Sequence, residues 1–497
     1  MSTALVIGGG MGGLASAALL AHHGYEVTLV EKNPLLGGRA NYFEAEGFRF
    51  DMGPSWYLMP DVFEHFFALL GERVEDHLEL QRLDPSYRIA FRGTDLTVDM
   101  FSDLGRDVET FERLEPGSGQ ALREYLQRSE EQYAIAIDQF MYRNHDSLLD
   151  FLDPRTAMQG RALHVFENMH RYISRSFSTD TVQKILEYQL VFLGSSPYNT
   201  PALYNIMSHI DFNMGVFYPR GGIYSIVRAL EAIGRRNGAE YRTEAPVAAI
   251  LTEGGRAAGV RLESGEELRA DLLISNADIA HTETALLPKQ ARTYSERYWS
   301  QRTLAPSAFI LYLGLRGRVP SLVHHNLGFG QDWRRAFGQI FDTPAWPDDP
   351  SYYVCAPSRT DPSTAPEGHE NLFVLVPVAP GLSMTDEDMV HYRRSALDLL
   401  ARDFDVPDLE ERIVFERTYT SRDFTADYNS LGGSALGLAH TMRQTVFRPN
   451  NVSKKLPNLY YVGASTNPGI GMPICLISAE LAYKRIIGDR STAPLPV

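Results

Sequence analysis

The sequence predicts a mixed α/β fold organised around a strand–turn–helix–strand unit at its N-terminal end. Residues 4–7 form an apolar strand, which runs into a glycine-rich turn and then an Ala/Leu-rich helix. Gly24 ends that helix, and residues 26–30 form a second strand that leads to Glu31. Strand, glycines, helix, strand and acidic residue in this order are typical of a dinucleotide-binding unit.

The glycine-rich turn fits the pattern G-x-G-x-x-G at Gly8, Gly10 and Gly13, with Gly12 between the last two. The first glycine allows a tight turn, the second lets a pyrophosphate approach the backbone, and the third lets the helix pack on the strand. Glu31 is expected to accept hydrogen bonds from a ribose hydroxyl. Because an acid at this position disfavours a 2′-phosphate, the motif leaves NAD or FAD as the ligand.

The same stretch admits a different interpretation, because residues 4–21 are uncharged and resemble a signal peptide or a membrane span. No basic segment precedes them, and they contain five glycines, which would form a helix poorly. We therefore expect the dinucleotide-binding unit. A nicotinamide-dependent dehydrogenase remains an alternative at this stage.

Glycine motifs continue beyond Glu31. The chain reads Lys32 to Ala40 with Gly37-Gly38-Arg39, and then reaches Gly53-Pro54-Ser55. A double glycine admits close backbone approach, and Arg39 offers a bidentate donor for phosphate. This arrangement resembles the extended FAD motif of the amine-oxidase-like flavoproteins. The resemblance implies that the Gly-Gly-Arg loop wraps the pyrophosphate and that the Gly-Pro-Ser turn approaches the flavin.

Composition excludes several function classes. At 497 residues the chain is too long for one core, and a net charge of −15 argues against nucleic acid as a partner. The two cysteines, Cys355 and Cys475, lie far apart without metal-ligand spacing, which predicts a reduced, cytoplasmic protein without disulfides. Neighbouring side chains diverge in strands and helices, so the adjacent pairs His22-His23 and His324-His325 predict no metal site.

Further elements follow the same sequence logic. We expect helices at 60–71, 109–150 with a break at 116–117, 222–236 and 386–404. Strands are expected at 87–100, around a turn at 93–95, and at 240–275, 303–315 and 372–378. Residues 342–371 hold six prolines and are predicted to form a loop.

Aromatic residues recur every few positions from 151 to 226, and this pattern has two interpretations. An ordinary helical core is the favoured one, since aromatic stripes are more often core than ligand site. Residues 155–184 nevertheless carry five basic residues against two acidic ones, which suggests a membrane-facing surface. The basic residues are Arg155, Arg161, Arg171, Arg175 and Lys184.

The C-terminal segment supplies a second glycine loop. A buried strand at 459–462 enters Gly463-Ala464, and Gly471-Met472-Pro473 begins a helix that ends before Gly488. The positive N-terminal end of this helix would point at the pyrimidine edge of a flavin and stabilise the anion that forms on reduction.

Several strings resemble the phytoene desaturase family over essentially the whole chain. They include residues 193–197, 201–204, 215–222, 276–278, 356–368 and 447–450. The resemblance implies FAD as cofactor and a strand whose backbone contacts the adenine at Val247. Two departures stand out, because family members often have His where Asn467 stands and Gly where Ile474 stands.

This resemblance also implies a domain organisation. A Rossmann-like, two-layer FAD-binding domain is expected to be joined to a β-sheet substrate domain and an inserted helical, membrane-associating subdomain. The FAD-binding domain would comprise residues 1–84, 222–284 and 435–497. Residues 85–110 and 285–434 would form the substrate domain, and residues 111–221 the helical subdomain.

The implied substrate is a long apolar polyene precursor, which offers neither a heteroatom nor an acidic proton. The flavin is therefore expected to carry the chemistry, by accepting a hydride while a proton leaves the neighbouring carbon. Asp153, Arg155 and Asn467 are weak candidates for catalytic side chains. The implied function is an FAD-dependent carotenoid desaturase that passes electrons to oxygen or a quinone, and that reaches its substrate by peripheral association with a membrane surface.

Three alternatives share these features in part. One is a redox-neutral carotene cis–trans isomerase on the same scaffold. Another is a desaturase of a C30 or hydroxylated carotenoid. The third is a flavin-free lipid-binding protein, which the complete set of glycines disfavours.

Overall fold

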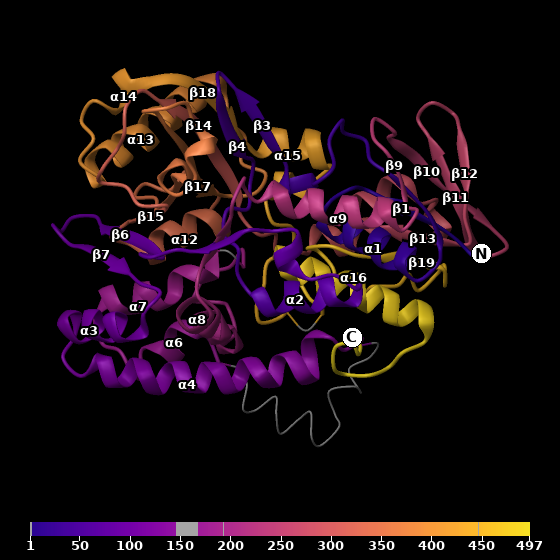
Figure 1. Cartoon of the computed structure of the whole chain (residues 1–497), viewed down its shortest axis with the longest axis horizontal. Helices are drawn as coiled ribbons and strands as arrows, with labels where there is room; N and C mark the ends of the chain where they lie inside the picture. Colours follow the sequence, from indigo (N-terminus) through magenta and orange to yellow (C-terminus); the bar gives the residue numbers. More distant parts are fainter. Residues whose placement is uncertain (1, 146–166, 192, 446) are drawn as a thin grey trace.

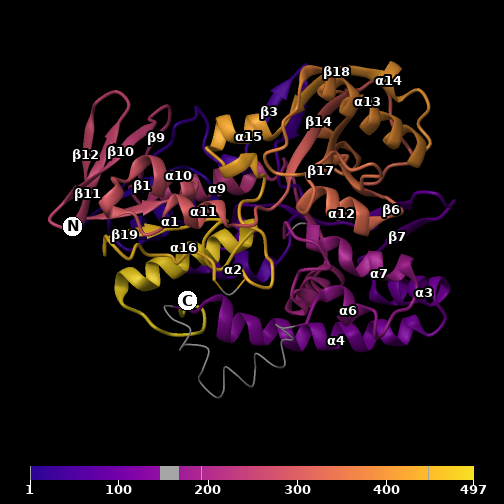
Figure 2. The same ribbon diagram turned by 180° about the vertical axis from the view of Figure 1, so that it is seen from behind.

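The computed structural model describes residues 2–145, 167–191, 193–445 and 447–497. Two large β-sheets lie side by side along the longest axis of the molecule, as Figures 1 and 2 show from opposite sides. Helices α3, α4, α6, α7 and α8 lie below the sheet with the orange strands in Figure 1.

The first sheet is parallel and has five strands in the order β19-β13-β1-β2-β9. Its strands are β1 (Thr3–Ile7), β2 (Glu26–Val30), β9 (Glu240–Arg242), β13 (Leu272–Ser275) and β19 (Leu459–Tyr461). Helices α1 (Met11–His22), α9 (Tyr224–Arg236) and α16 (Met472–Ile487) pack together over one face. The other face packs against an antiparallel sheet of β10 (Val247–Glu253), β11 (Arg256–Leu262) and β12 (Glu267–Arg269). Burial on both faces explains why β1 is apolar almost throughout.

The second sheet has seven strands in the order β18-β14-β17-β16-β15-β6-β7. They are β6 (Tyr87–Phe91), β7 (Thr97–Met100), β14 (Ser307–Leu315), β15 (His325–Phe329), β16 (Tyr352–Cys355), β17 (Glu370–Val378) and β18 (Ile413–Tyr419). All neighbours are antiparallel except β15 and β6. Helix α13 (Asp386–Asp403) packs in the cluster on one face, and every residue of β14 is buried.

Further helices and strands lie outside these sheets in the described part of the chain. The helices are α2 (Pro60–Leu69), α3 (Leu104–Leu114), α4 (Ser118–Ala136), α6 (Met169–Ile173), α7 (Asp180–Glu187), α8 (Ile206–Ser208), α10 (Ile279–His281), α11 (Glu296–Ser300), α12 (Trp333–Phe341), α14 (Leu409–Arg412) and α15 (Ser421–Tyr428). Two further sheets have two antiparallel strands each: β3 (Tyr42–Ala45) with β4 (Phe48–Asp51), which form a hairpin, and β5 (Leu80–Arg82) with β8 (Phe217–Pro219), which are distant in sequence.

Most predicted elements agree with the structure, with three differences. The helical segment expected to continue to residue 150 ends at Met141, and residues 142–145 are not helical. The helical segment expected from residue 109 begins at Leu104, because the Asp103 side chain accepts a hydrogen bond from the Arg106 amide and caps it. The loop predicted at 342–371 contains strand β16. Its prolines, Pro350 and Pro357, flank the strand and therefore leave its ladder intact.

The aromatic stretch from 151 to 226 belongs mainly to the core. Tyr172, Phe177, Tyr188, Phe212 and Tyr218 are all buried. Phe166 and Phe192 lie outside the described residues. This agrees with the favoured interpretation of the pattern.

The basic patch predicted at 155–184 is smaller in the structure. Lys184 is buried, and its ammonium donates to the carbonyl oxygens of Gly330 and Gln331, so it cannot face a membrane. Arg175 is exposed and lies 2.5 Å from the Glu167 carboxylate, and Arg171 is exposed. Arg155 and Arg161 lie outside the described residues.

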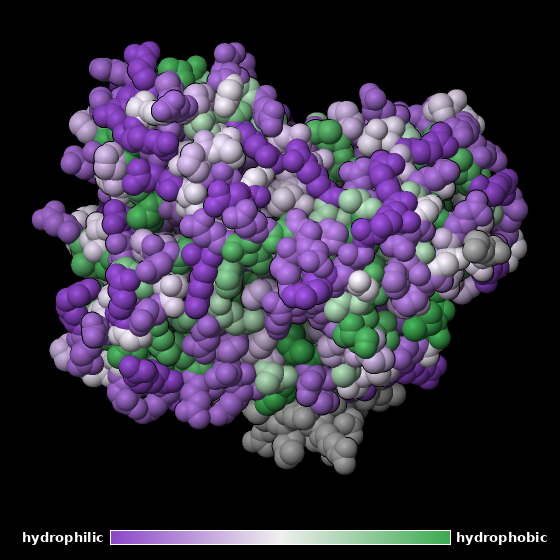
Figure 3. Space-filling view, in the orientation of Figure 1, coloured by the Kyte–Doolittle hydropathy of each residue, from purple (hydrophilic) through white to green (hydrophobic). Residues whose placement is uncertain are grey.

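Within the described ranges, none of the helices is both long and apolar enough to cross a membrane. On the face drawn in Figure 3, hydrophilic residues predominate, and hydrophobic residues form several small groups.

Candidate functional site

A cavity of about 1580 Å³ extends from the carboxyl ends of the parallel strands to the seven-stranded sheet. Ile7 and Val30, the last residues of β1 and β2, line one part of it, and Leu327 and Phe373 of β15 and β17 line another. A ligand site outside the carboxyl ends of parallel strands is the usual position in open α/β sheets.

The structure brings almost all the predicted cofactor residues to this cavity. Those that line it are Gly8, Gly10, Gly12, Glu31, Lys32, Gly37, Gly38, Arg39, Gly53, Pro54, Ser55, Val247, Gly463, Ala464, Gly471 and Met472. Gly13 does not line the cavity. A Cβ atom there would overlap the Gly8 carbonyl oxygen, so its role is close packing of helix on strand, as the motif predicts.

Two glycine loops pack backbone against backbone beside the first turn of α1. The Gly37 amide donates to the Gly9 carbonyl at 2.7 Å, and a Cβ atom at Gly38 would lie 3.1 Å from Gly10 Cα. Gly37 has a φ of 115°, which glycine adopts without strain. The amides at the start of α1 lack acceptors within the helix, so this end of the cavity suits a phosphate group.

Glu31 is fixed at the wall of this part of the cavity and is 6% exposed. One carboxylate oxygen accepts from the Gly9 amide at 2.7 Å and the other from the Asn33 amide at 2.8 Å. Each oxygen can accept a further hydrogen bond, which leaves capacity for ribose hydroxyls.

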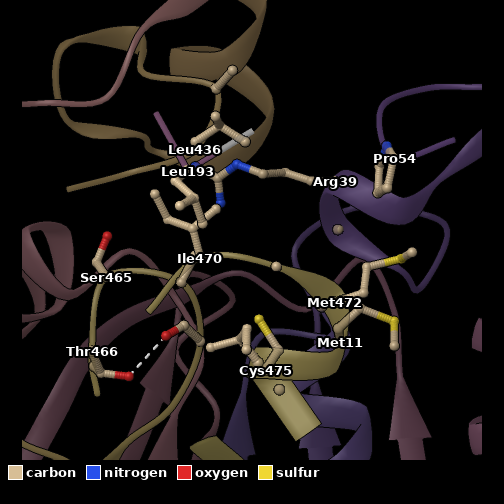
Figure 4. Close-up of a pocket in the computed structure, with 18 of the residues that line it drawn as sticks. Met11, Arg39, Pro54, Leu193, Leu436, Ser465, Thr466, Ile470, Met472 and Cys475 are labelled. Carbon is tan, nitrogen blue, oxygen red and sulfur yellow. Dashed lines mark hydrogen bonds between the residues drawn. The ribbon is translucent and has the colours of Figure 1, made fainter. Parts of the chain in front are cut away.

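Arg39 extends across the cavity toward Leu193 and Leu436 in Figure 4. Its guanidinium donates to Ser430 Oγ at 3.0 Å, whereas its buried Nε has no partner among the described residues. An unpaired, buried guanidinium nitrogen is costly without an acceptor. The residues present therefore fit an anionic group of a dinucleotide in this cavity.

The N-terminus of α16 also faces the cavity. Gly471 caps the helix with a φ of 126°, and Met472 is the first helical residue, so Pro473 occupies the second position. Figure 4 shows Met472 beside Met11 of α1, with Cys475 close by. Two helix N-termini thus meet at one place, where both favour negative charge.

The glycine turn at residues 8–13 and the glycine loop at residues 463–471 form the polar end of the cavity, which we call the cradle. Asn276 lies between these two segments and was not predicted as a site residue. A Cβ atom at Gly10 would lie 2.7 Å from Asn276 Nδ2, and one at Gly12 would lie 2.7 Å from Asn276 Oδ1. A Cβ atom at Gly463 would lie 3.0 Å from the same oxygen. The position directly after β13 was the available signal, since this strand lies next to β1.

Apolar side chains line the part of the cavity that faces the seven-stranded sheet. They include Trp56, Leu193, Leu203, Ile206, Met207, Ile210, Ile310, Leu327, Phe329, Trp333, Phe337, Phe373, Leu375 and Ile470. An apolar chamber next to a few fixed polar groups is typical of a site for an apolar small molecule.

His440, a second residue that sequence reasoning missed, supports the loop at 467–471. The Ile470 amide donates to His440 Nε2 at 3.2 Å, and Nδ1 is hydrogen-bonded to the Tyr204 hydroxyl. Burial, with Arg448 nearby, holds the pKa of His440 well below its usual range. His440 is therefore neutral and carries its proton on Nδ1, and Nε2 stays an acceptor that fixes the loop.

Of the three weak candidates for catalytic side chains, the structure describes only one. Asn467 lines the cavity, where its backbone oxygen accepts from Asn451 Nδ2 at 3.0 Å. Asp153 and Arg155 lie outside the described residues.

The expectation that adjacent histidines diverge is wrong in this protein. The rings of His324 and His325 lie 4.4 Å apart, because His324 precedes β15 and does not follow the alternation of a strand. His22 and His23 also make an edge contact, at 5.2 Å. In the described part of the chain, His324, His325 and Cys355 form a buried group whose ligand atoms lie within 4.8 Å of one another.

Comparison with known proteins places this geometry in a family. Residues 11–487 match the family of flavin-containing amine oxidoreductases. The chain belongs to this family. A carotenoid 3,4-desaturase of Haloarcula japonica is 48% identical over 97% of this chain and 98% of the relative. A zeta-carotene-forming phytoene desaturase of Myxococcus xanthus is 40% identical over 97% and 93%.

Solved structures share the fold of this flavoenzyme. An oxidoreductase from Methanosarcina mazei has a TM-score of 0.64 at 19% identity, covering 97% of this chain and all of that one. Putrescine oxidase bound to putrescine has a TM-score of 0.62 at 13% identity, covering 98% and 99%. The protein is an FAD-dependent oxidoreductase, in agreement with the extended motif and with Glu31.

Proposed function

We propose that this flavoenzyme is a carotenoid desaturase, which introduces double bonds into a long apolar polyene. The observation that carries the proposal is one continuous cavity, which joins a glycine-lined cradle to an apolar, aromatic chamber. Relatives over nearly the full length are named for carotenoid and phytoene desaturation, which supports the same substrate class.

Each group of residues has a proposed task. Bound FAD would supply the hydride acceptor. The α1 amides and Arg39 would hold the pyrophosphate, and Glu31 the ribose of the cofactor. The backbone near Val247 would contact the adenine, and the N-terminus of α16 would face the flavin pyrimidine edge. These roles rest on the positions of the residues around the cavity.

The chamber would orient the substrate without hydrogen bonds. Its aliphatic side chains exclude water, so a polyene gains the free energy of burial along its length. Aromatic rings such as Trp56, Phe373 and Trp333 line the same chamber. Their faces would stabilise positive charge on the polyene as the hydride leaves.

We propose the domain division on the same grounds. The strands of the parallel sheet come from residues 1–84, 222–284 and 435–497, which would form the FAD-binding domain. The strands of the seven-stranded sheet come from residues 85–110 and 285–434, which would form the substrate domain.

Product analysis tests the function. The purified holoenzyme is incubated in liposomes with phytoene or with an already conjugated carotenoid, with oxygen or a quinone as acceptor. A product that absorbs at longer wavelength, together with reduced acceptor, supports desaturation. Isomerisation without a change in conjugation length supports the isomerase alternative, and absence of flavin from the purified protein contradicts both.

We also propose where the protein meets a membrane. Met442 and Phe447 are 37% and 51% exposed and both line the cavity, so they mark an apolar rim at its opening. Arg443 between them is exposed. An apolar rim with a basic residue suits the surface of a bilayer in which a polyene dissolves.

Liposome sedimentation tests this rim. The double variant Met442→Asp/Phe447→Asp should bind liposomes at least about tenfold more weakly, because each side chain contributes roughly 1.5–3 kcal/mol when buried. The matched control is Val390→Asp/Val414→Asp, since these valines are 68% and 44% exposed and do not line the cavity. Equal binding of the rim variant and the parent would place the membrane contact elsewhere.

A further inference from the structure

A chain of hydrogen bonds leads from the cavity wall into the seven-stranded sheet. Ser55 Oγ lies 2.8 Å from the Tyr353 hydroxyl, and that hydroxyl lies 2.7 Å from His325 Nδ1. Ser55 and Tyr353 line the cavity, whereas His325 does not and is fully buried. We propose that Ser55, Tyr353 and His325 form a proton relay, which takes up the proton that leaves the substrate during desaturation. This inference rests on the proposed function.

The fold holds the three groups in line. His325 of β15 pairs with Cys355 of β16, so Tyr353, two residues earlier, points to the same face of the sheet. Trp56 follows Ser55 in sequence and stacks on the His325 ring, with ring centres 4.1 Å apart and planes 7° apart. The stack fixes the ring plane that aims Nδ1 at the Tyr353 hydroxyl.

The surroundings of His325 keep it neutral between turnovers. The groups that face it are the His324 ring, the Cys355 thiol, Tyr353 and Trp56, and none of them carries a negative charge. Burial and the neighbouring His324 lower the pKa of His325 well below its usual range. Burial also raises the pKa of Cys355 to about 12, so the thiol stays protonated.

The relay requires the tautomer of neutral His325 that carries its proton on Nε2. With its proton on Nε2, the ring accepts at Nδ1 from the Tyr353 hydroxyl, and Tyr353 accepts from Ser55. The lone pairs of Ser55 Oγ are then free for the cavity. His325 Nε2 has no hydrogen-bond partner among the described residues, so no competing contact fixes the other tautomer.

The transfer balances in atoms and charge. Bound FAD would supply the hydride acceptor for one carbon, and Ser55 Oγ would take the proton from the neighbouring carbon. The electron pair of that C–H bond becomes the new C=C bond. The Ser55 proton passes to Tyr353, and the Tyr353 proton forms an N–H bond at Nδ1. The proton held on His325 would leave by the same path, because oxygen or a quinone, as the electron acceptor, would take up one proton in each turnover.

A weak base is sufficient for this step, because a carbon next to a cationic centre loses its proton readily. Positioned general bases typically contribute about 10²–10⁴ in rate. Tyr353→Phe keeps the ring and removes only the middle hydroxyl. It should lower kcat about a hundredfold and leave KM and bound flavin unchanged.

Non-additive effects of two substitutions on kcat distinguish a relay from ordinary packing. Ser55→Ala, Tyr353→Phe and the double variant should all lose the same factor in kcat, since one break interrupts the whole path. Tyr125→Phe is the matched control, because it removes the same group from another buried tyrosine, whose hydroxyl lies 3.2 Å from Ser208 Oγ, and neither residue lines the cavity. It should stay within about twofold of the parent.

A second measurement tests the relay without following the reaction. Nitrogen-15 NMR of histidine-labelled holoenzyme should show His325 Nδ1 as an unprotonated acceptor, assigned by its loss in His325→Gln. Its shift should move in Tyr353→Phe. A protonated Nδ1, or multiplicative losses in the double variant, would overturn the relay. A parent that makes no double bonds would instead refute the proposed function, whatever the NMR result.

Cobalt titration tests the competing assignment of the histidine–cysteine group as a metal site. A thiolate-to-cobalt absorption band that persists in Cys475→Ser and disappears in Cys355→Ser would assign His324, His325 and Cys355 to a metal. That result would overturn the relay, because the metal would occupy a ring nitrogen. Absence of the band in the parent supports it.

Discussion

The two ends of the cavity differ in the atoms that line them. The cradle beside the parallel sheet consists mainly of backbone: glycine loops, two helix N-termini and a few fixed polar groups such as Glu31. The chamber beside the seven-stranded sheet consists of large side chains from strands and helices far apart in the sequence. Backbone amides suit a charged cofactor, whereas an apolar chain would be recognised by shape and burial alone.

This difference has a consequence for mutational sensitivity. At the cradle, one added side chain blocks the backbone approach that binding needs. In the chamber, a side chain of similar volume can be exchanged at little cost, whereas a larger one displaces substrate. Changes at the two ends should therefore affect different observables, flavin content at one and conversion at the other.

The largest expected effect is at Gly10. In Gly10→Val the added side chain meets Asn276 and fills the space beside the first turn of α1, so the purified protein should contain less than about a tenth of the parent's flavin. The ratio of flavin to protein absorbance measures it. Gly24→Asn is the control, because a Cβ atom there meets nothing within 4 Å. A yellow Gly10→Val protein with full flavin content would contradict the proposed cradle.

In the chamber, we expect a substitution to reduce conversion without reducing flavin content. Leu327→Trp places a larger ring in the cavity from β15, so conversion of a polyene should fall at least about a hundredfold while bound flavin stays normal. Overpacking should cost about 1–3 kcal/mol of stability. Leu327→Met, which conserves volume, should convert at nearly the parent rate. Product analysis and flavin content together check both, and equal conversion by the two variants would remove Leu327 from the substrate path.

An intermediate effect, on the affinity for FAD, is expected at Glu31. Glu31→Ala removes the acceptors proposed for the ribose and the partners of the Gly9 and Asn33 amides, so FAD should bind about 10–100-fold more weakly. Fluorescence titration of apoprotein with FAD measures the dissociation constant. Glu26→Ala, at the exposed start of the same strand, should leave it unchanged.

The smallest effect concerns a buried carboxyl beside the chamber. Asp211 Oδ2 accepts from Tyr87 at 2.8 Å, Tyr188 at 3.0 Å and Gln189 at 2.6 Å, and burial raises the pKa of Asp211 to about 6. A raised pKa stabilises the fold below about pH 4, and this contribution is lost as the pH rises through 6.

Asp211→Asn should therefore gain stability relative to the parent between pH 4 and 7, by at most about 3 kcal/mol. Flavin content should not change. Thermal unfolding of both proteins across this range gives the difference, and a constant difference would show that Asp211 does not titrate there.

The same contrast explains what the sequence could predict. Glycine spacing, Glu31 and the Gly-Gly-Arg string predict the cradle because backbone approach requires particular residues at fixed intervals. His440 and Asn276 could not be found this way, since their roles depend on contacts across long stretches of sequence. Strand β16 was missed because its four residues lie between prolines. The chamber could not be found from one local pattern, because four separate strands contribute only two or three residues each.

The path of the chain has a consequence for how the protein unfolds. The polypeptide passes between the parallel and the seven-stranded sheet four times, before β6, β9, β14 and β19. No single cut separates the two sheets into intact pieces, because the parallel sheet takes strands from both sides of every crossing. We therefore expect one cooperative unfolding transition, and limited proteolysis should not release a stable half. A substitution that destabilises the substrate chamber should then also shorten the lifetime of the folded cofactor cradle, even where the freshly purified protein has a normal flavin content.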